Sequence, residues 1–184
     1  MDRIKVAWII GAIGRGGVLT VSCTAAEFVA KKAQMEVSLV AINTCTGGFV
    51  PPSGVRLEVL NLPFEVISAV QGFLQWLERN PQNVLLFNDA SFVEPSWPFI
   101  PADTILIPVL HDVASGWRKN IIRYKDSWDM VITVSEFVRD ALANDIPTYS
   151  AKIKTVLNGT TSVSYTHLRA HETPEHLVCR LLLE

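Results

Sequence analysis

The sequence has no long hydrophobic run, no strong charge of either sign and no regular pattern of cysteines. Its longest apolar stretches, such as Val6–Ile10 and Thr104–Leu110, are far shorter than the ~18 residues of a membrane span. Its 16 basic and 18 acidic residues give a formal net charge of −2, whereas proteins that bind nucleic acid are usually basic. We therefore expect an ordinary globular protein with no nucleic acid among its partners.

The cysteines and the N-terminus also exclude a secreted protein. Cys23, Cys45 and Cys179 follow neither a CxxC spacing nor a disulfide framework, which is typical of the reduced cytoplasm. The segment Met1–Ile10 has a short apolar run but no small-residue cleavage site after it, so no signal peptide is predicted. We expect a cytoplasmic protein.

The C-terminal segment differs in character from the rest of the chain and contains three of the four histidines. His167 and His171 are four residues apart, a spacing that can bind a metal from one face of a helix. The leucines that follow also allow an ordinary amphipathic helix. A third interpretation, that the segment is not native protein, explains its sequence better than either of these.

Two parts of this segment resemble translated sequencing-library DNA. Val163–Thr173 resembles a sequencing adapter, and Leu177–Glu184 resembles the flow-cell primer that follows it in such libraries. The two matches share one reading frame and are separated by the gap of a sample index. We therefore interpret residues 161–184 as a non-native tail and predict no metal site there.

The preceding residues, 1–160, alternate between expected strands and helices. Short apolar runs typical of buried strands occur at 5–10, 36–42, 55–60, 83–87, 104–110, 130–134 and 153–157. Helical spacing of apolar residues follows the glycines at 14–17 and recurs at 64–79 and 135–144. This alternation predicts an α/β, Rossmann-like parallel sheet with helices on both faces.

Two of the expected helices have a predicted buried face. The residues expected to face the core are Val21, Ala25, Phe28 and Val29 in the first helix, and Phe137, Val138, Ala141 and Leu142 in the last.

A glycine-rich turn, Gly14-Arg15-Gly16-Gly17, lies between the first expected strand and the first helix. Glycine lets the backbone approach a ligand closely, and the helix N-terminus that follows offers free N–H groups to a phosphate. The alternative is a tight turn whose backbone angles require glycine. The sequence favours neither interpretation over the other.

Two nucleotide-binding fingerprints are missing. A G-x-G-x-x-G pattern would need glycine at Ile13 if it began at Gly11, and at Leu19 if it began at Gly14. Asn43 stands near the place of the acidic residue expected after the second strand, and the chain contains no GxxxxGK[ST] motif. We expect no cofactor and no bound metal.

Two further candidate residues directly follow expected strands. His111 is the only histidine before the tail, and an imidazole at the carboxyl end of a strand can donate to an oxyanion or move a proton. A plain loop histidine is the alternative, but the position favours function. Ser135 is better explained as a helix N-cap, with a ligand role in addition.

Four motifs in this order resemble the N-terminal domain of family-four glycosyltransferases, which have the two-domain GT-B fold. They are a strand leading to GRGG, then ILIPVLHD, DMVITVSEFVRDAL and KIKTVLNGT. The resemblance covers about Ile4–Thr160. It implies that the parent protein transfers a sugar from a nucleotide-sugar to an acceptor, with retention at the anomeric carbon, and that this chain is its acceptor-side half.

The resemblance also implies roles for individual residues. Gly16 and Gly17, next to Gly14, match a loop that lies against the donor diphosphate and the acceptor. His111 matches a histidine that contacts the transferred sugar, and we take it as the catalytic candidate. Ser135 matches a serine at the start of the late helix, so it joins the three glycines as a donor- or acceptor-binding candidate.

The chain departs from the family in two respects. Asn158 and Gly159 match the turn before the second domain, but that domain is missing, and in the family it binds the nucleotide-sugar and carries two glutamates separated by seven residues. Val18 and Leu19 stand where the family often has alanine and glutamate. We expect this chain to be inactive alone.

The expected partners are a nucleotide-sugar donor, bound mainly by the missing domain, and a glycan, lipid or small-molecule acceptor. Peripheral contact with a membrane stays open. Two alternatives also stay open: a nucleotide- or sugar-nucleotide-binding Rossmann module without catalytic activity, and a dehydrogenase-like enzyme, which the imperfect glycine pattern disfavours. A donor-binding domain encoded after codon 162 would favour the transferase, and a natural stop codon the module.

Deleting Val163–Glu184 should change the free energy of unfolding little, because adapter-derived residues have not been selected to pack on the preceding domain. Denaturant unfolding of the 184-residue chain and of a chain ending at Ser162 measures the difference. A loss of several kcal/mol, large against a typical total of ~5–15 kcal/mol, would show that the tail belongs to the folded protein.

Overall fold

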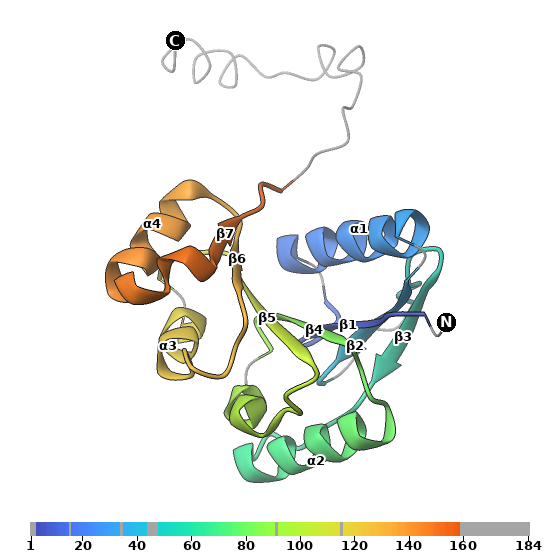
Figure 1. Cartoon of the computed structure of the whole chain (residues 1–184). Coiled ribbons are helices and arrows are strands. Elements are labelled where there is room, and N and C mark those ends of the chain that lie inside the picture. The colour runs from blue at the N-terminus through green and yellow to red at the C-terminus, as the bar shows by residue number, and fades with distance from the viewer. Residues whose placement is uncertain are drawn as a thin grey trace, which may run out of the picture.

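The structure, a computed structural model, describes residues 3–14, 16–33, 35–43, 48–90, 92–114 and 116–158. Seven parallel strands form one sheet in the order β3-β2-β1-β4-β5-β6-β7 (Figure 1). The strands are β1 (Lys5–Ile10), β2 (Glu36–Ala41), β3 (Val55–Val59), β4 (Val84–Asn88), β5 (Ile105–Leu110), β6 (Val131–Thr133) and β7 (Ile153–Thr155). The tail interpreted above as non-native lies outside the described residues, so that interpretation stays a prediction.

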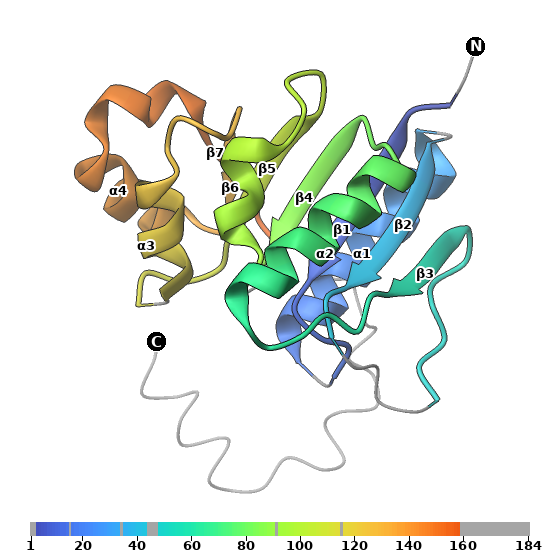
Figure 2. The ribbon, with the colours of Figure 1, turned by 90° about the horizontal axis from the view of Figure 1, so that it is seen from below.

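Helices connect the strands. They are α1 (Gly17–Lys32), α2 (Val66–Arg79), α3 (Gly116–Arg123) and α4 (Glu136–Asp145), with the 3-10 helices η1 (Glu94–Phe99) and η2 (Pro147–Lys152). Figure 2 looks onto the face of the sheet that carries α2, with α1 behind it. The predicted α/β, Rossmann-like parallel sheet with helices on both faces is confirmed.

The strand order reverses between β1 and β4. The chain first builds outward from β1 to β2 and β3, and then returns to the other side of β1 to add β4 to β7. Trp8 in the middle of β1 therefore pairs with Leu39 of β2 on one side and with Leu86 of β4 on the other. The chain after β1 leads to α1 and the chain after β4 leads to η1, which pack on opposite faces of the sheet, and ligands usually bind at such a switch point.

The larger core lies between the sheet and α2, η1, α3 and α4. A row of edge-to-face aromatic contacts crosses it, with ring centroids 5.6 Å apart for Phe73 and Phe87, 5.4 Å for Phe87 and Trp97, and 5.5 Å for Trp97 and Trp117. The indole N–H of Trp117 donates to the carbonyl of Val109 at 2.8 Å. These contacts fix η1 and α3 against β4 and β5, the strands whose ends carry the site.

Helix α1 packs on the other face, and two of the four predicted residues, Ala25 and Val29, pack against this core. Ser22 and Ala26 are its buried residues, whereas Phe28 is 63% exposed and the other three predicted residues are half-buried. Small side chains at these two positions allow the helix axis to approach the strands closely, so the larger side chains lie along its flanks. The prediction for α1 was therefore right for Ala25 and Val29 and wrong for Phe28, because the centre of the buried face lies about one residue further along the helix.

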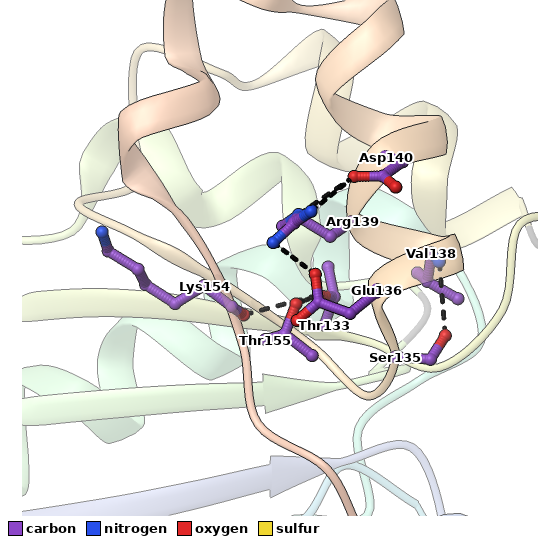
Figure 3. A network of polar contacts seen from close by, with 8 residues as sticks. All are labelled: Thr133, Ser135, Glu136, Val138, Arg139, Asp140, Lys154 and Thr155. Carbon is purple, nitrogen blue, oxygen red and sulfur yellow. Dashed lines mark hydrogen bonds and ion pairs between the residues drawn. The ribbon is translucent and has the colours of Figure 1, made fainter.

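Helix α4 begins at a serine N-cap, as the sequence predicts. The Val138 N–H donates to the Ser135 hydroxyl oxygen at 3.3 Å (Figure 3). Val138 and Leu142 are buried as predicted, but Phe137 is 71% exposed. Helical spacing alone therefore did not predict which residues border the buried face of α4.

The loop after β1 passes very close to the loop after β4. A Cβ atom added to Gly11 would lie 2.9 Å from the carbonyl oxygen of Asp89, closer than real Cβ contacts come. The obstacle is backbone, which cannot rotate away as the end of a side chain can. Glycine at position 11 is therefore required for these two loops to meet.

Replacing Gly11 with alanine should lower the free energy of unfolding by about 1–3 kcal/mol, the usual cost of overpacking. Gly116→Ala is the matched control, because a Cβ at Gly116 would meet no atom within 4 Å and the residue begins a helix. Denaturant unfolding of both variants gives the comparison. Equal stabilities would mean that the two loops separate at little cost.

Candidate functional site

A pocket of about 210 Å³ lies at the switch point between the carboxyl ends of β1 and β4. Its walls are the loop after β1, the first turn of α1 and the end of β4, and the lining residues are Ile10, Gly11, Ala12, Gly14, Gly16, Val18, Leu19, Asn88 and Asp89. Two of the three predicted site glycines line it. In open parallel sheets this position is the usual place for a ligand.

The backbone gives no conformational reason for glycine at the predicted positions. None of Gly14, Gly16 and Gly17 has a φ in the left-handed region, and Gly16 has an extended φ of 166°. A Cβ atom at any of the three would meet no protein atom within 4 Å. The tight-turn explanation therefore finds no support in the geometry of the described residues.

The N-terminus of α1 has no side-chain cap. Gly16 is its N-cap residue, and the first turn contains no acidic residue. By contrast, N–H groups at the start of α2 and α4 are bound by the side chains of Glu65 and Ser135. Among the residues that the structure describes, no side chain caps the start of α1, which lies beside the pocket and where the helix dipole favours an anion.

His111 follows β5 and is half-buried. Its Nε2 lies 3.4 Å from the Oδ1 atom of Asn88. Burial lowers the pKa of His111, although the nearby carboxylates of Asp89 and Asp112 act in the opposite direction. The imidazole is therefore favoured in its neutral form at neutral pH.

Strand β4 separates His111 from the glycine loop. Because β4 lies between β1 and β5, the two predicted site elements are not on neighbouring strands. Asn88 joins them, since it lines the pocket and also contacts His111. His111 itself is not among the residues that line the pocket, so a shared ligand for His111 and the glycines stays a prediction.

The sequence analysis did not single out Asn88. It ended the fourth strand at Phe87, whereas β4 extends to Asn88, which is 3% exposed. The feature that could have indicated Asn88 as a site residue is that it is polar and directly follows a predicted apolar strand. Without the strand order, however, nothing in the sequence indicated that this strand borders the switch point.

The other predicted site residues lie away from the glycine pocket. Ser135 follows β6 and caps α4, and Thr133, at the end of β6, has its hydroxyl 3.3 Å from that of Thr155 of β7 (Figure 3). Asn158 is exposed and helps to line a separate, mostly apolar pocket of about 100 Å³ next to Trp8. Gly159 lies outside the described residues.

A buried carboxyl group lies just after the end of β4. Glu94 is 2% exposed, and its Oε1 atom has no hydrogen-bond partner among the described residues. Burial raises the pKa of Glu94 to about 7, although hydrogen bonds from backbone N–H groups and from Asn120 act in the opposite direction. The loop before it contains two non-glycine residues with positive φ, Asp89 at 48° and Phe92 at 87°.

Among the residues that the structure describes, no helix combines the length and hydrophobicity of a membrane span. Within the same ranges, no three His, Cys, Asp or Glu side chains gather where they would hold a metal ion.

Comparison with known proteins shows the fold. No protein-family model and no curated protein sequence matches the chain. Solved structures that it resembles include HepE from Anabaena in complex with UDP, with a TM-score of 0.61 and 16% identity over 91% of this chain and 49% of that one. UDP-N-acetylglucosamine 2-epimerase from Rickettsia bellii gives a TM-score of 0.56 and 16% identity over 85% and 45%.

A third similar structure is an alpha-glucosyltransferase in complex with UDP-glucose and DNA containing an abasic site, with a TM-score of 0.56 and 13% identity over 87% of this chain and 44% of that one. The chain thus spans about half the length of the solved structures it matches. Their folds are of the GT-B glycosyltransferase and epimerase type, and this chain has the fold of a GT-B domain.

The buried Glu94 should make stability depend on pH. Its pKa in the folded protein, about 7, exceeds that of an unfolded glutamate, so it contributes fully below pH ~4.3 and the contribution is lost as pH rises through about 7. Glu94→Gln removes this dependence. The free energy of unfolding of the wild type relative to this variant should fall by about 2–3 kcal/mol between pH 4.5 and 8.

Urea unfolding at several pH values measures this difference. Glu78→Gln is the control, because it removes one carboxyl group at an exposed position on α2. A pH-independent difference between the wild type and Glu94→Gln would mean that the carboxyl group is solvated in solution.

Proposed function

We propose that this chain is the acceptor-side half of a glycosyltransferase that transfers a sugar from a nucleotide-sugar donor with retention at the anomeric carbon. The observation that carries the proposal is the pocket at the switch point, where Gly14 and Gly16 have no left-handed φ and a Cβ atom on either would meet no protein atom within 4 Å. In this proposal, glycine at these two positions leaves room for a ligand to approach the backbone closely.

The comparisons support this class of ligand. HepE is described in complex with UDP, the glucosyltransferase in complex with UDP-glucose, and the epimerase is named for a UDP-sugar. Their identity to this chain is 16% or less, so the likeness supports a nucleotide-sugar through the fold rather than through shared residues. In this proposal, a donor-binding second domain completes the cleft.

Each site residue then has a distinct role. The backbone of Gly14, Gly16 and Gly17 and the uncapped start of α1 lie against the diphosphate. His111, neutral at the end of β5, forms a hydrogen bond with the transferred sugar. Ser135 contributes a weaker ligand contact in addition to capping α4.

Catalysis in this proposal is mainly positioning and stabilisation of the departing diphosphate. Backbone N–H groups and a helix dipole that are already oriented can stabilise developing negative charge without rearrangement. Asn158 and Gly159 form the turn that leads to the donor-binding half. Without that half, this chain is expected to bind donor weakly and to show no turnover.

The test is made in a full-length transferase that carries this domain together with a donor-binding half. His111→Ala should lower kcat by about 100-fold or more, because it removes a contact made in the transition state. Gly16→Val should instead raise the KM for the nucleotide-sugar, since its side chain occupies space next to the diphosphate. Gly116→Val is the control, because a Cβ atom added at Gly116 would also meet no atom within 4 Å.

The assay should follow both transfer to an acceptor and epimerisation of the donor sugar, because one of the similar structures is an epimerase. Unchanged kcat in His111→Ala, with the fold intact by circular dichroism, would remove His111 from the mechanism. Donor binding without any turnover in the wild type would favour the non-catalytic nucleotide-binding module.

A further inference from the structure

We propose that Asn88 is a positioning residue that sets the hydrogen-bonding state of His111. Its side-chain oxygen keeps the hydrogen of the neutral imidazole on Nε2, so that Nδ1 is left as a hydrogen-bond acceptor. The contact between Asn88 and His111 follows from the geometry of the structure. Its role in catalysis rests on the proposed function.

Asn88 lies between the glycine pocket and His111. It is the last residue of β4, and its Cα pairs with Ile10 of β1 and with Val109 of β5. It is 3% exposed, lines the glycine pocket and contacts His111. A polar side chain this deeply buried needs partners, because an unsatisfied buried amide is costly.

The orientation of the Asn88 amide follows from its second partner. The Nδ2 atom donates to the carbonyl oxygen of Leu86 at 3.4 Å. In the reversed orientation two acceptor oxygens would face each other there. The side-chain oxygen therefore points to His111 Nε2, also at 3.4 Å.

The state of the ring follows from the orientation of the amide. An amide oxygen can only accept, so the His111 Nε2 atom opposite it must carry a hydrogen. Burial lowers the pKa of His111 and favours the neutral ring, in which only one nitrogen is protonated. The other nitrogen, Nδ1, then has a free lone pair.

The identity of the residue at position 88 matters for the charge of the ring. Both contacts of the amide are long compared with the usual ~2.9 Å, so each is weak, although the Asn88 side chain itself is buried. An aspartate at this position would stabilise a positively charged imidazole instead. The neutral asparagine leaves His111 suited to accept a hydrogen bond from a ligand hydroxyl, a group that sugars offer, and unsuited to pair with a phosphate.

The first test is nuclear magnetic resonance of the full chain with ¹⁵N-labelled histidine, which distinguishes the two neutral forms of the ring and follows its titration. The His111→Gln variant assigns the His111 signals among the four histidines. We expect hydrogen on Nε2 in the wild type. Hydrogen on Nδ1 would overturn the proposal, and this result needs no variant at position 88.

The same experiment on Asn88→Asp should show the His111 pKa raised by about one unit or more, as expected for a carboxylate placed next to an imidazole. Asn61→Asp is the matched control, because Asn61 is exposed after β3, four strands and about 19 Å from β5 across the sheet. An unchanged His111 titration in a folded Asn88→Asp variant would mean that the two side chains do not interact.

The second test separates positioning from direct contact with substrate. In the full-length transferase, Asn88→Leu should lower kcat by about tenfold with little change in the KM of the donor, because the ligand still finds its binding groups. The double variant Asn88→Leu with His111→Ala should be no slower than His111→Ala alone. Additive losses would show that Asn88 acts on the ligand itself and would overturn the positioning role.

The two tests also separate this inference from the proposed function. If the ring carries its hydrogen on Nε2 and Asn88→Asp shifts its titration, the contact is established even where His111→Ala leaves turnover unchanged. That combination of results would contradict the proposed role of His111 in a transferase, but it would still support the contact between Asn88 and His111.

Discussion

The close approach of the backbone after β1 to the backbone after β4 is the constraint on which the site depends. Gly11 passes so near the carbonyl of Asp89 that no Cβ atom fits between them. This approach occurs where the strand order reverses, so it holds the two loops together while the first turn of α1 diverges from the end of β4. The pocket lies at this approach, since Gly11 and Asp89 line it together with the first turn of α1 and Asn88.

The site on this half of the cleft relies on dipoles more than on side-chain charges. No lysine or arginine is among the described residues that line the pocket; glycine backbone and a helix N-terminus line it, and Asp89 is its one charged side chain among those residues. The nearest imidazole is favoured in its neutral form because burial lowers its pKa. Within the proposed function, such a surface orients a ligand, and most of the positive charge that a diphosphate requires would come from the other half of the cleft.

The fold was predictable because strands of a parallel sheet are buried on both faces. Each strand then reads as a short, continuous apolar run, and β1, β2 and β5 lie within one residue of their predicted bounds. Helix faces were less predictable, as Phe28 shows, because the buried face depends on how closely a helix approaches the sheet. Spacing indicates that a helix is amphipathic, but small residues such as Ser22 and Ala26 decide which side packs.

The sequence by itself determined the fold class, the ends of most strands, the glycine turn, the serine cap of α4 and the position of His111 at the end of a strand. Each of these depends on local spacing or on the chemistry of a few neighbouring residues. Only the tertiary structure decided that β4 lies between the glycine loop and His111, and that Asn88 touches both parts of the site. Strand order depends on how distant segments pack, and hydrophobic runs that are alike in composition carry little information about their neighbours in the sheet.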